Sequence, residues 1–306
     1  MAIKANKGDI MHDVIVIGGG PAGLQAALTL GRVHRDVVLL DSGQYRNATV
    51  EHMQNFIGRD GTPPSELRAV ARKELEAYET VAVREVEATA VEAADDGFTV
   101  STDDGPVRAR ALVLATGVRD TLPETPGLPD LWGREAAHCP FCHGHEVSGR
   151  RVGILGAGPH AGSLGSLLSN IASSVVVLAD GEDPTDDVAA RLDALGIDVR
   201  PEPVRELRRS DDGVVALLDG GDEVELAGIF VSPAMTQAAP FAEQLGLSML
   251  DSGCIEIDAL GRTSLQGVYA AGDLAHVASL PGPLSSVVNA AAAGQTAGAA
   301  CAHDLM

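Results

Sequence analysis

The stretch that decides the fold is DVIVIGGGPAGLQAALTL, residues 13–30. It opens with an apolar run that predicts a buried strand, followed by glycines in G-x-G-x-x-G spacing at Gly18, Gly20 and Gly23. A helix is predicted to begin at Pro21, where the missing N–H of proline is harmless. In this pattern the glycines permit a tight turn, a close approach to a diphosphate, and close helix–strand packing. The stretch therefore predicts a dinucleotide-binding βαβ unit.

A second apolar strand, DVVLL at residues 36–40, completes this unit and ends at Asp41. Asp41 lies 23 residues after Gly18. An acid at about this distance accepts a hydrogen bond from an adenosine ribose, while the N-terminus of the helix holds the diphosphate. We interpret Asp41 as the ribose ligand.

The same unit recurs in residues 151–178. A predicted strand at 151–155 leads into Gly156, Gly158 and Ala161, which have G-x-G-x-x-A spacing, and then into a helix and another strand. Two such units predict an α/β chain with two Rossmann-like domains.

Just before the second unit stands HCPFCHGHE, residues 138–146, which is compatible with three chemistries. C-x-x-C-H is a signature of covalent haem attachment, but no export signal is evident. Zinc is a second reading, yet no second C-x-x-C or H-x3-5-H pair occurs to complete such a site. A C-x-x-C pair can also form a catalytic disulfide, and the flanking dinucleotide units favour this redox reading. The ligands available for zinc would be His138, Cys139, Cys142, His143 and His145.

Composition excludes several partners. The 306 residues include 43 acidic and 22 basic side chains, a formal charge of −21, so we expect no nucleic acid partner and no anionic membrane partner. No apolar stretch approaches the roughly 20 residues needed to cross a bilayer. Without an export signal we expect a cytoplasmic protein, whose four cysteines are not a structural disulfide framework.

The order of motifs resembles the low-molecular-weight thioredoxin reductases over essentially the whole chain. After the first glycine fingerprint come A-T-G at 115–117, the C-x-x-C, the second fingerprint, and A-A-G-D at 270–273. The resemblance implies two Rossmann-like domains of three-layer ββα type, the second inserted into the first. The predicted segments are an FAD domain at 1–118 and 241–306, and an inserted pyridine-nucleotide-like domain at 119–240 that carries the cysteines.

The resemblance also implies a set of FAD ligands, with Asp273 near the ribityl and phosphate region, and no metal site. The implied cofactor-binding residues are Gly18, Gly20, Pro21, Ala22, Gly23, Asp41, Asn47, Ala115, Thr116, Gly117, Gly272 and Asp273.

One departure from this family concerns the second nucleotide. The family holds the 2′-phosphate of NADPH with a histidine and paired arginines after the second strand of the inserted domain. Here the run is LADGED, residues 178–183, in which Asp180, Glu182 and Asp183 would repel a phosphate. NADPH is therefore not expected. Asp180 could still accept a hydrogen bond from an unphosphorylated ribose, which leaves NADH possible.

A second departure points to a branch. CPFCHGHE resembles the C-x-x-C-H-G-x-E stretch of FAD-dependent dithiol oxidases of the gliotoxin and holomycin type, although His145 stands where that branch has an aromatic residue. The resemblance implies that a small-molecule dithiol is oxidised through Cys139, the outer sulfur, and Cys142, the flavin-facing one, with molecular oxygen as a possible acceptor. His143 is the preferred base, supported by His145 and Glu146.

Two other functions remain open. One is an NAD(P)H-dependent reductase of a thioredoxin-like protein, and the other is a non-catalytic flavoprotein redox sensor. The family is commonly dimeric, so a homodimer is expected.

Overall fold

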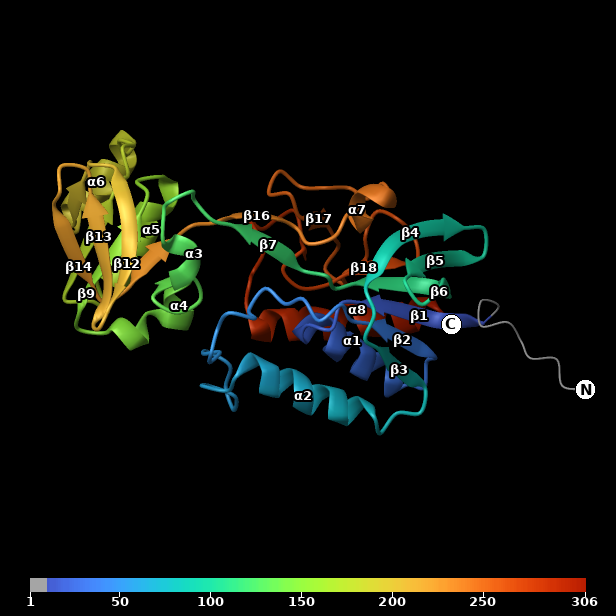
Figure 1. Cartoon of the computed structure of the whole chain (residues 1–306). Helices are drawn as coiled ribbons and strands as arrows, with labels where there is room; N and C mark the ends of the chain where they lie inside the picture. Colours follow the sequence, from blue (N-terminus) through green and yellow to red (C-terminus); the bar gives the residue numbers. More distant parts are fainter. Residues whose placement is uncertain (1–9) are drawn as a thin grey trace, which may run out of the picture. The chain divides into compact units, whose positions relative to one another are not determined.

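The computed structural model describes residues 10–306 and divides the chain into two compact units. The first unit contains the chain up to Ala48 together with residues 65–119 and 235–306, and the second contains 49–64 and 120–234. Both units are α/β (Figure 1), in agreement with the predicted fold class.

The chain passes between the units four times, at 48/49, 64/65, 119/120 and 234/235. The domain borders at 118/119 and 240/241 stay a prediction from the sequence. Residues 49–64 group with the second unit, because Glu51 forms an ion pair of 2.9 Å with Arg134 and Thr49 lies against Gly133.

The first unit is built on a seven-stranded sheet in the order β3-β2-β1-β6-β5-β4, with β18 also paired to β6. Strands β1, β2, β3, β6 and β18 are parallel, and β4 and β5 add an antiparallel edge. Its strands are β1 (Met11–Ile17), β2 (Val37–Leu40), β3 (Val81–Arg84), β4 (Ala88–Ala94), β5 (Gly97–Thr102), β6 (Val107–Leu114) and β18 (Val268–Ala270).

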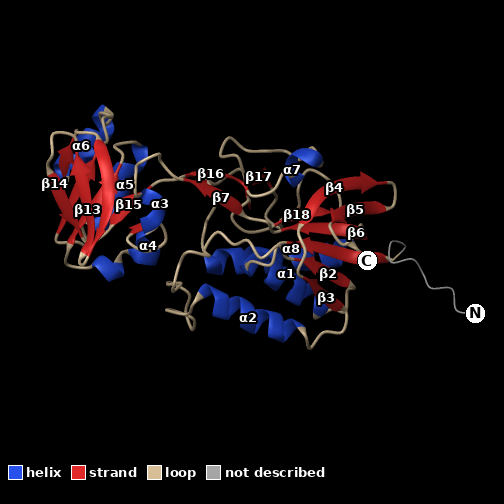
Figure 2. Ribbon diagram, in the orientation of Figure 1, coloured by secondary structure: helices blue, strands red, loops and turns tan. Residues whose placement is uncertain are grey.

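Strand β1 is apolar on both faces, and both of its faces are buried. Helices α1 (Pro21–Gly31) and α8 (Val287–Asp304) cover one face of the sheet (Figure 2). Val14 and Val16 pack on that face, whereas Ile15 and Ile17 pack on the other. The rest of the unit consists of α2 (Pro64–Leu75), α7 (Phe241–Gln244), β17 (Ile255–Glu256) and β19 (Ala275–His276).

Two short strands contain two of the four points at which the chain passes between the units. They are β7 (Val118–Thr121) and β16 (Ala234–Gln237). The proline-rich run that follows β7 belongs to the second unit. Helix α3 (Leu128–Leu131) lies in this run and buries Leu128 and Leu131 in the core of that unit.

The second unit has three layers. A parallel sheet in the order β11-β10-β9-β15-β8 packs its Leu155 face against an antiparallel sheet of β12, β13 and β14, and its Ile154 face against helices α5 and α6. This is the predicted ββα arrangement. The strands are β8 (Ala136–Ala137), β9 (Arg151–Leu155), β10 (Ser174–Leu178), β11 (Asp198–Arg200), β12 (Val204–Ser210), β13 (Gly213–Leu218), β14 (Glu223–Leu226) and β15 (Ile229–Val231). The remaining helices are α4 (Pro140–His143), α5 (Pro159–Leu168), α6 (Asp186–Ala194) and a 3-10 turn at His145–Val147.

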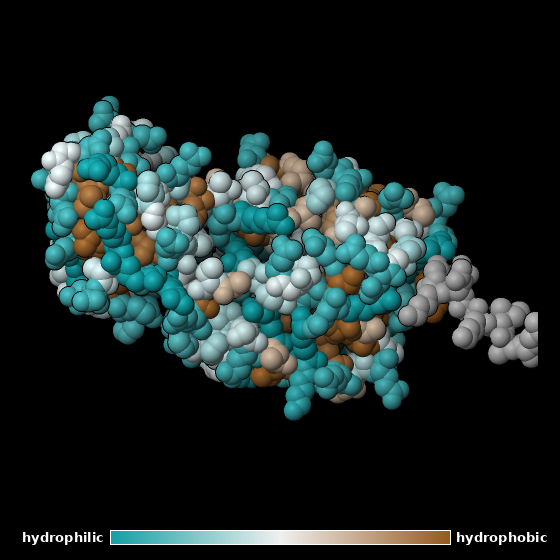
Figure 3. All heavy atoms as spheres, viewed as in Figure 1, coloured by the Kyte–Doolittle hydropathy of each residue, from teal (hydrophilic) through white to brown (hydrophobic). Residues whose placement is uncertain are grey.

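The face drawn in Figure 3 is covered mainly by hydrophilic residues, as the high content of acidic side chains suggests. Within residues 10–306, no helix has both the length and the apolar character that a membrane span requires.

Candidate active site

The first glycine turn leaves open space where a diphosphate is expected. A side chain on Gly18, whose φ is +115°, would collide with the carbonyl oxygen of Ala115, and one on Gly23 would collide with the carbonyl oxygen of Gly18. By contrast, a Cβ on Gly20 would meet no heavy atom within 4 Å. The turn is therefore closed on its inner side and open in front of its second glycine, which is the shape that admits a phosphate group.

The helix that follows also fits an anionic cofactor. Gly20 is the N-cap of α1, no side chain caps this end, and the first turn contains no acidic residue. The N–H groups of the first helical turn lack intrahelical partners and attract a diphosphate. Gly272 approaches the same turn, since a Cβ there would be 3.1 Å from Cβ of Ala22. These residues fit the diphosphate portion of FAD.

Asp41 is buried, and its carboxylate accepts three hydrogen bonds. Oδ1 accepts a hydrogen bond from N–H of Gly43 at 3.0 Å, and Oδ2 accepts from the Tyr45 hydroxyl at 2.7 Å and from Arg72. Burial alone would raise the pKa of Asp41, but these hydrogen bonds outweigh it and hold the pKa below its ordinary value. Gly19 has no side chain because a Cβ there would collide with this carboxylate.

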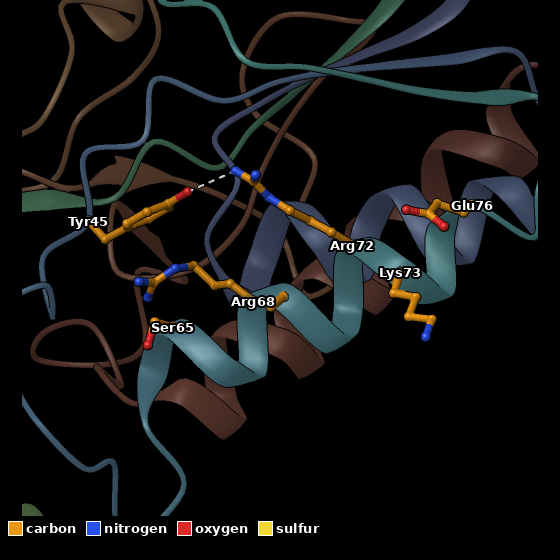
Figure 4. Close-up of a pocket in the computed structure, with 7 residues that line it drawn as sticks. Tyr45, Ser65, Arg68, Arg72, Lys73 and Glu76 are labelled. Atoms are coloured by element: carbon orange, nitrogen blue, oxygen red, sulfur yellow. Dashed lines mark hydrogen bonds between the residues drawn. The ribbon is translucent and has the colours of Figure 1, made fainter.

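A surface pocket of about 400 Å³ lies along α2 next to this network (Figure 4). The Tyr45 hydroxyl accepts a hydrogen bond from Arg72 at 3.0 Å, and the Arg68 guanidinium lies 3.8 Å from the centre of the Tyr45 ring. Arg68 also donates to Oδ1 of Asn47 at 3.2 Å. Tyr45, Arg68 and Arg72 were missed in the sequence, although the i, i+4 spacing of the two arginines placed them on one helix face.

The predicted Asp273 is paired within the first unit. Its Oδ2 accepts a hydrogen bond from Nη1 of Arg46 at 2.8 Å, and Arg46 was not singled out in the sequence. Ala115 continues the sheet by donating to Ile17 O at 2.8 Å, with Thr116 next to it. Gly117 has φ +72° and closes this segment. All twelve predicted cofactor residues thus belong to the first unit.

The two cysteines of the C-x-x-C face each other in the second unit. Sγ of Cys142 lies 2.7 Å from Sγ of Cys139, and no disulfide joins them in this structure. Helix α4 brings them together: Pro140 starts the helix, and the N–H groups of Cys142 and His143 donate to Cys139 O at 3.0 and 3.1 Å. The other two cysteines, Cys254 and Cys301, are buried in the first unit.

His143 is partly buried directly after Cys142. Burial lowers the pKa of His143, although the charge of Glu146 and a backbone hydrogen bond with Gly133 act in the opposite direction. Its Nδ1 is buried and finds no hydrogen-bond partner in the described part of the chain. A neutral imidazole next to a pair of thiols can accept a proton. His145 and Glu146 are both exposed on the 3-10 turn that follows.

The second glycine turn carries a different set of contacts. Asp180, which the sequence suggested as a ribose acceptor, has φ +56°, and its Oδ1 accepts a hydrogen bond from N–H of Val204 at 2.6 Å. Arg200, at the end of β11, forms ion pairs with Glu202 at 3.0 Å and Asp222 at 2.8 Å. In residues 10–306, no three His, Cys, Asp or Glu side chains gather as a metal site.

Comparison with known proteins shows the family of this chain. Residues 12–295 match the pyridine nucleotide-disulphide oxidoreductase family. A protein named thioredoxin reductase sirT, from Leptosphaeria maculans, is 34% identical over 312 residues, which cover 94% of this chain and 92% of that protein. The crystal structure of HlmI superposes with a TM-score of 0.87 at 37% identity, covering 99% of this chain and 95% of that one. An oxidoreductase from Agrobacterium tumefaciens superposes with a TM-score of 0.88 at 34% identity, covering 96% and 98%.

An open glycine turn for a dinucleotide, together with a facing pair of thiols, defines a flavoprotein that acts on sulfur groups. The chain belongs to the pyridine nucleotide-disulphide oxidoreductase family. The resemblance to thioredoxin reductases is thereby confirmed, and so is the prediction of an oxidoreductase.

Proposed function

We propose that this protein is an FAD-dependent dithiol oxidase that converts a small-molecule dithiol to its disulfide through Cys139 and Cys142, with oxygen as the final acceptor. The sulfur chemistry is supported by the 2.7 Å approach of the two Sγ atoms beside a histidine of lowered pKa. We further propose a cytoplasmic homodimer.

The proposal that the enzyme oxidises dithiols, and does not reduce disulfides with NADPH, rests on the charged residues of the loop after β10. Asp180 is an acidic side chain, and its Oδ1 accepts a hydrogen bond from N–H of Val204. The guanidinium of Arg200, at the end of β11, is paired with two carboxylates. A 2′-phosphate would meet negative charge and no unpaired guanidinium from Arg200. This argues against NADPH as the electron source and favours a dithiol substrate.

The proposed sulfur steps balance as two exchanges. A substrate thiolate attacks Sγ of Cys139 in the oxidised pair, which breaks the Sγ–Sγ bond and leaves a mixed disulfide and the Cys142 thiolate. The second substrate thiolate then attacks the substrate sulfur of that mixed disulfide, which releases the cyclic product and Cys139. His143 takes the proton of an incoming thiol, and Glu146 supports its positive charge. When bound, FAD supplies a two-electron acceptor that oxygen reoxidises, with hydrogen peroxide as the product.

In the first unit, the residues that would hold FAD are the open turn at Gly20, the buried Asp41, and the loop at Gly272 and Asp273. Asn47 and the segment at 115–117 complete the proposed set.

An anaerobic titration of the purified holoprotein tests the proposal. We expect dithiothreitol to bleach the visible flavin absorption and Cys139→Ser to abolish that bleaching, whereas NADPH leaves the absorption unchanged. Rapid bleaching by NADPH or NADH, with turnover of an added thioredoxin, would instead identify a reductase. A single reduction by dithiol without repeated turnover in air would identify a redox sensor.

A further inference from the structure

The two glycine turns of this chain differ at one position that faces the ligand side. The first reads G-G-G-P-A-G from Gly18, and the second reads G-A-G-P-H-A from Gly156. Ala22 in the first turn therefore corresponds to His160 in the second. The backbone of the second glycine is the same in both turns, with φ −78° and ψ −178° at Gly20, and φ −66° and ψ −178° at Gly158. The turns can be compared directly.

The space in front of the second glycine is not the same in the two turns. A Cβ on Gly20 would meet nothing within 4 Å, but a Cβ on Gly158 would lie 3.2 Å from Cε1 and Nδ1 of His160. A Cβ on Gly156 would lie 3.8 Å from Cε1 and Nε2 of the same ring. The second glycine is the position at which a dinucleotide diphosphate approaches the backbone. The imidazole of His160 therefore folds back over the turn and occupies that place.

One nitrogen of this ring is buried. Nε2 of His160 is buried and has no hydrogen-bond partner among residues 10–306. A diphosphate could not reach the backbone of Gly158 unless this ring first rotated away. The ring thus competes with a nucleotide for the same space.

The ribose end of the two units does not separate them in the same way. Oδ1 of Asp180 accepts a hydrogen bond from N–H of Val204 at 2.6 Å, much as Oδ1 of Asp41 accepts one from N–H of Gly43 at 3.0 Å. The difference that bears on dinucleotide binding is therefore the His160 ring over the second glycine turn.

We propose that His160 is a specificity-determining residue that closes the second dinucleotide turn against NADH and NADPH, so that electrons reach this enzyme from dithiols. The inference rests on the proposed function, which it extends by naming the residue that excludes the pyridine nucleotide. In this proposal the second unit keeps the Rossmann fold and holds the cysteine pair, while the His160 ring occupies the position at which a nucleotide diphosphate would bind.

The test is a pair of matched substitutions in the holoprotein. His160→Ala restores the residue found at the equivalent position of the first turn, and His160→Phe keeps a ring of similar bulk without its nitrogens. NADH binding is measured by anaerobic equilibrium titration, and flavin bleaching by NADH is followed in the same samples. Circular dichroism checks that each variant is folded, and His160→Ser is a second way to remove the ring.

We expect His160→Ala and His160→Ser to bind NADH about tenfold or more tightly than the wild type, because the apparent affinity scales with the fraction of molecules whose site is open. His160→Phe should bind no better than the wild type. The proposal would be overturned if the wild type bound NADH as tightly as His160→Ala does. It would also be overturned if His160→Phe bound NADH as tightly as His160→Ala.

Failure of this inference is distinguishable from failure of the proposed function. Dithiol-driven bleaching is measured in the wild type and all three variants. If dithiols bleach the flavin but removal of the ring leaves NADH affinity unchanged, the role of His160 is wrong and the dithiol oxidase stands. If dithiols do not bleach even the wild type, the proposed function itself is wrong.

Discussion

Nη2 of Arg72 donates a hydrogen bond to Oδ2 of Asp41, and so ties helix α2 to the acid that closes the first dinucleotide unit. The same guanidinium binds the Tyr45 hydroxyl at 3.0 Å, so one cation organises both groups around the buried carboxylate. Because Arg72 stabilises the charged form of Asp41, we infer that it keeps this acid ready to accept a hydrogen bond from a ribose.

Arg72→Ala should therefore weaken FAD binding about tenfold, equivalent to about 1.4 kcal/mol. The substitution removes a charge-assisted hydrogen bond from the buried Asp41 carboxylate. Flavin fluorescence on adding FAD to the flavin-free protein measures the affinity. The control is Lys73→Ala, an exposed cation in the same pocket. Equal FAD affinity in Arg72→Ala and Lys73→Ala would contradict the role given to Arg72.

Serine at Cys142 should abolish dithiol turnover while FAD stays bound. The sulfur exchange needs two thiols that face each other, and serine cannot form a disulfide with Cys139. Oxygen consumption with a small dithiol measures turnover, and the visible spectrum reports bound flavin. Cys301→Ala, which removes a buried thiol in the first unit, should retain turnover. Retained turnover in Cys142→Ser would show that electrons take another route.

His143→Gln should lower kcat/KM for the dithiol by about 10²- to 10⁴-fold, the usual contribution of a general base. A base acts in its neutral form, and burial lowers the pKa of His143 below its ordinary value. Wild-type activity should then fall as the pH drops through this lowered pKa, below the ordinary histidine value of about 6.5. The glutamine variant should lack that acidic limb.

The exposed His145 provides the comparison for this profile. His145→Gln should keep the acidic limb and most of the activity, because its side chain lies on the exposed 3-10 turn. If His145→Gln loses the limb and His143→Gln keeps it, the roles of the two histidines are exchanged.

Gly294→Ala should destabilise the first unit by about 1–3 kcal/mol, the usual range for overpacking. A Cβ on Gly294 in α8 would collide with the carbonyl oxygen of Ala22 in α1. Chemical denaturation followed by circular dichroism measures the change. Gly282→Ala is the matched control, since a Cβ there would meet nothing within 4 Å. A loss of stability in both variants would mean that close α1–α8 packing is not its cause.

Much of the candidate site could be predicted from the sequence because its parts are local. The glycine turns at Gly18 and Gly156 were recognised from spacing, since a tight turn between strand and helix restricts which residues fit. The C-x-x-C also follows from spacing, because one helical turn brings residues i and i+3 to the same side.

Pairs formed between distant segments were not predicted. Arg46 and Asp273 are 227 residues apart in sequence, and Arg72 and Asp41 are 31 apart. No local pattern links such residues, so neither arginine was singled out. The composition of the proline-rich run after β7 does not reveal that Leu128 is buried in the core of the second unit, because that burial depends on segments distant in sequence.

The sequence by itself determined that this chain has two dinucleotide-type units and a redox-competent cysteine pair, because backbone turns and i, i+3 spacing are set by neighbouring residues. Only the tertiary structure decided which side chains hold Asp41 and Asp273, how far His143 is buried, and that the His160 ring lies over its own glycine turn. These features depend on side-chain orientation and on contacts between segments that only folding brings together, and local sequence patterns determine neither.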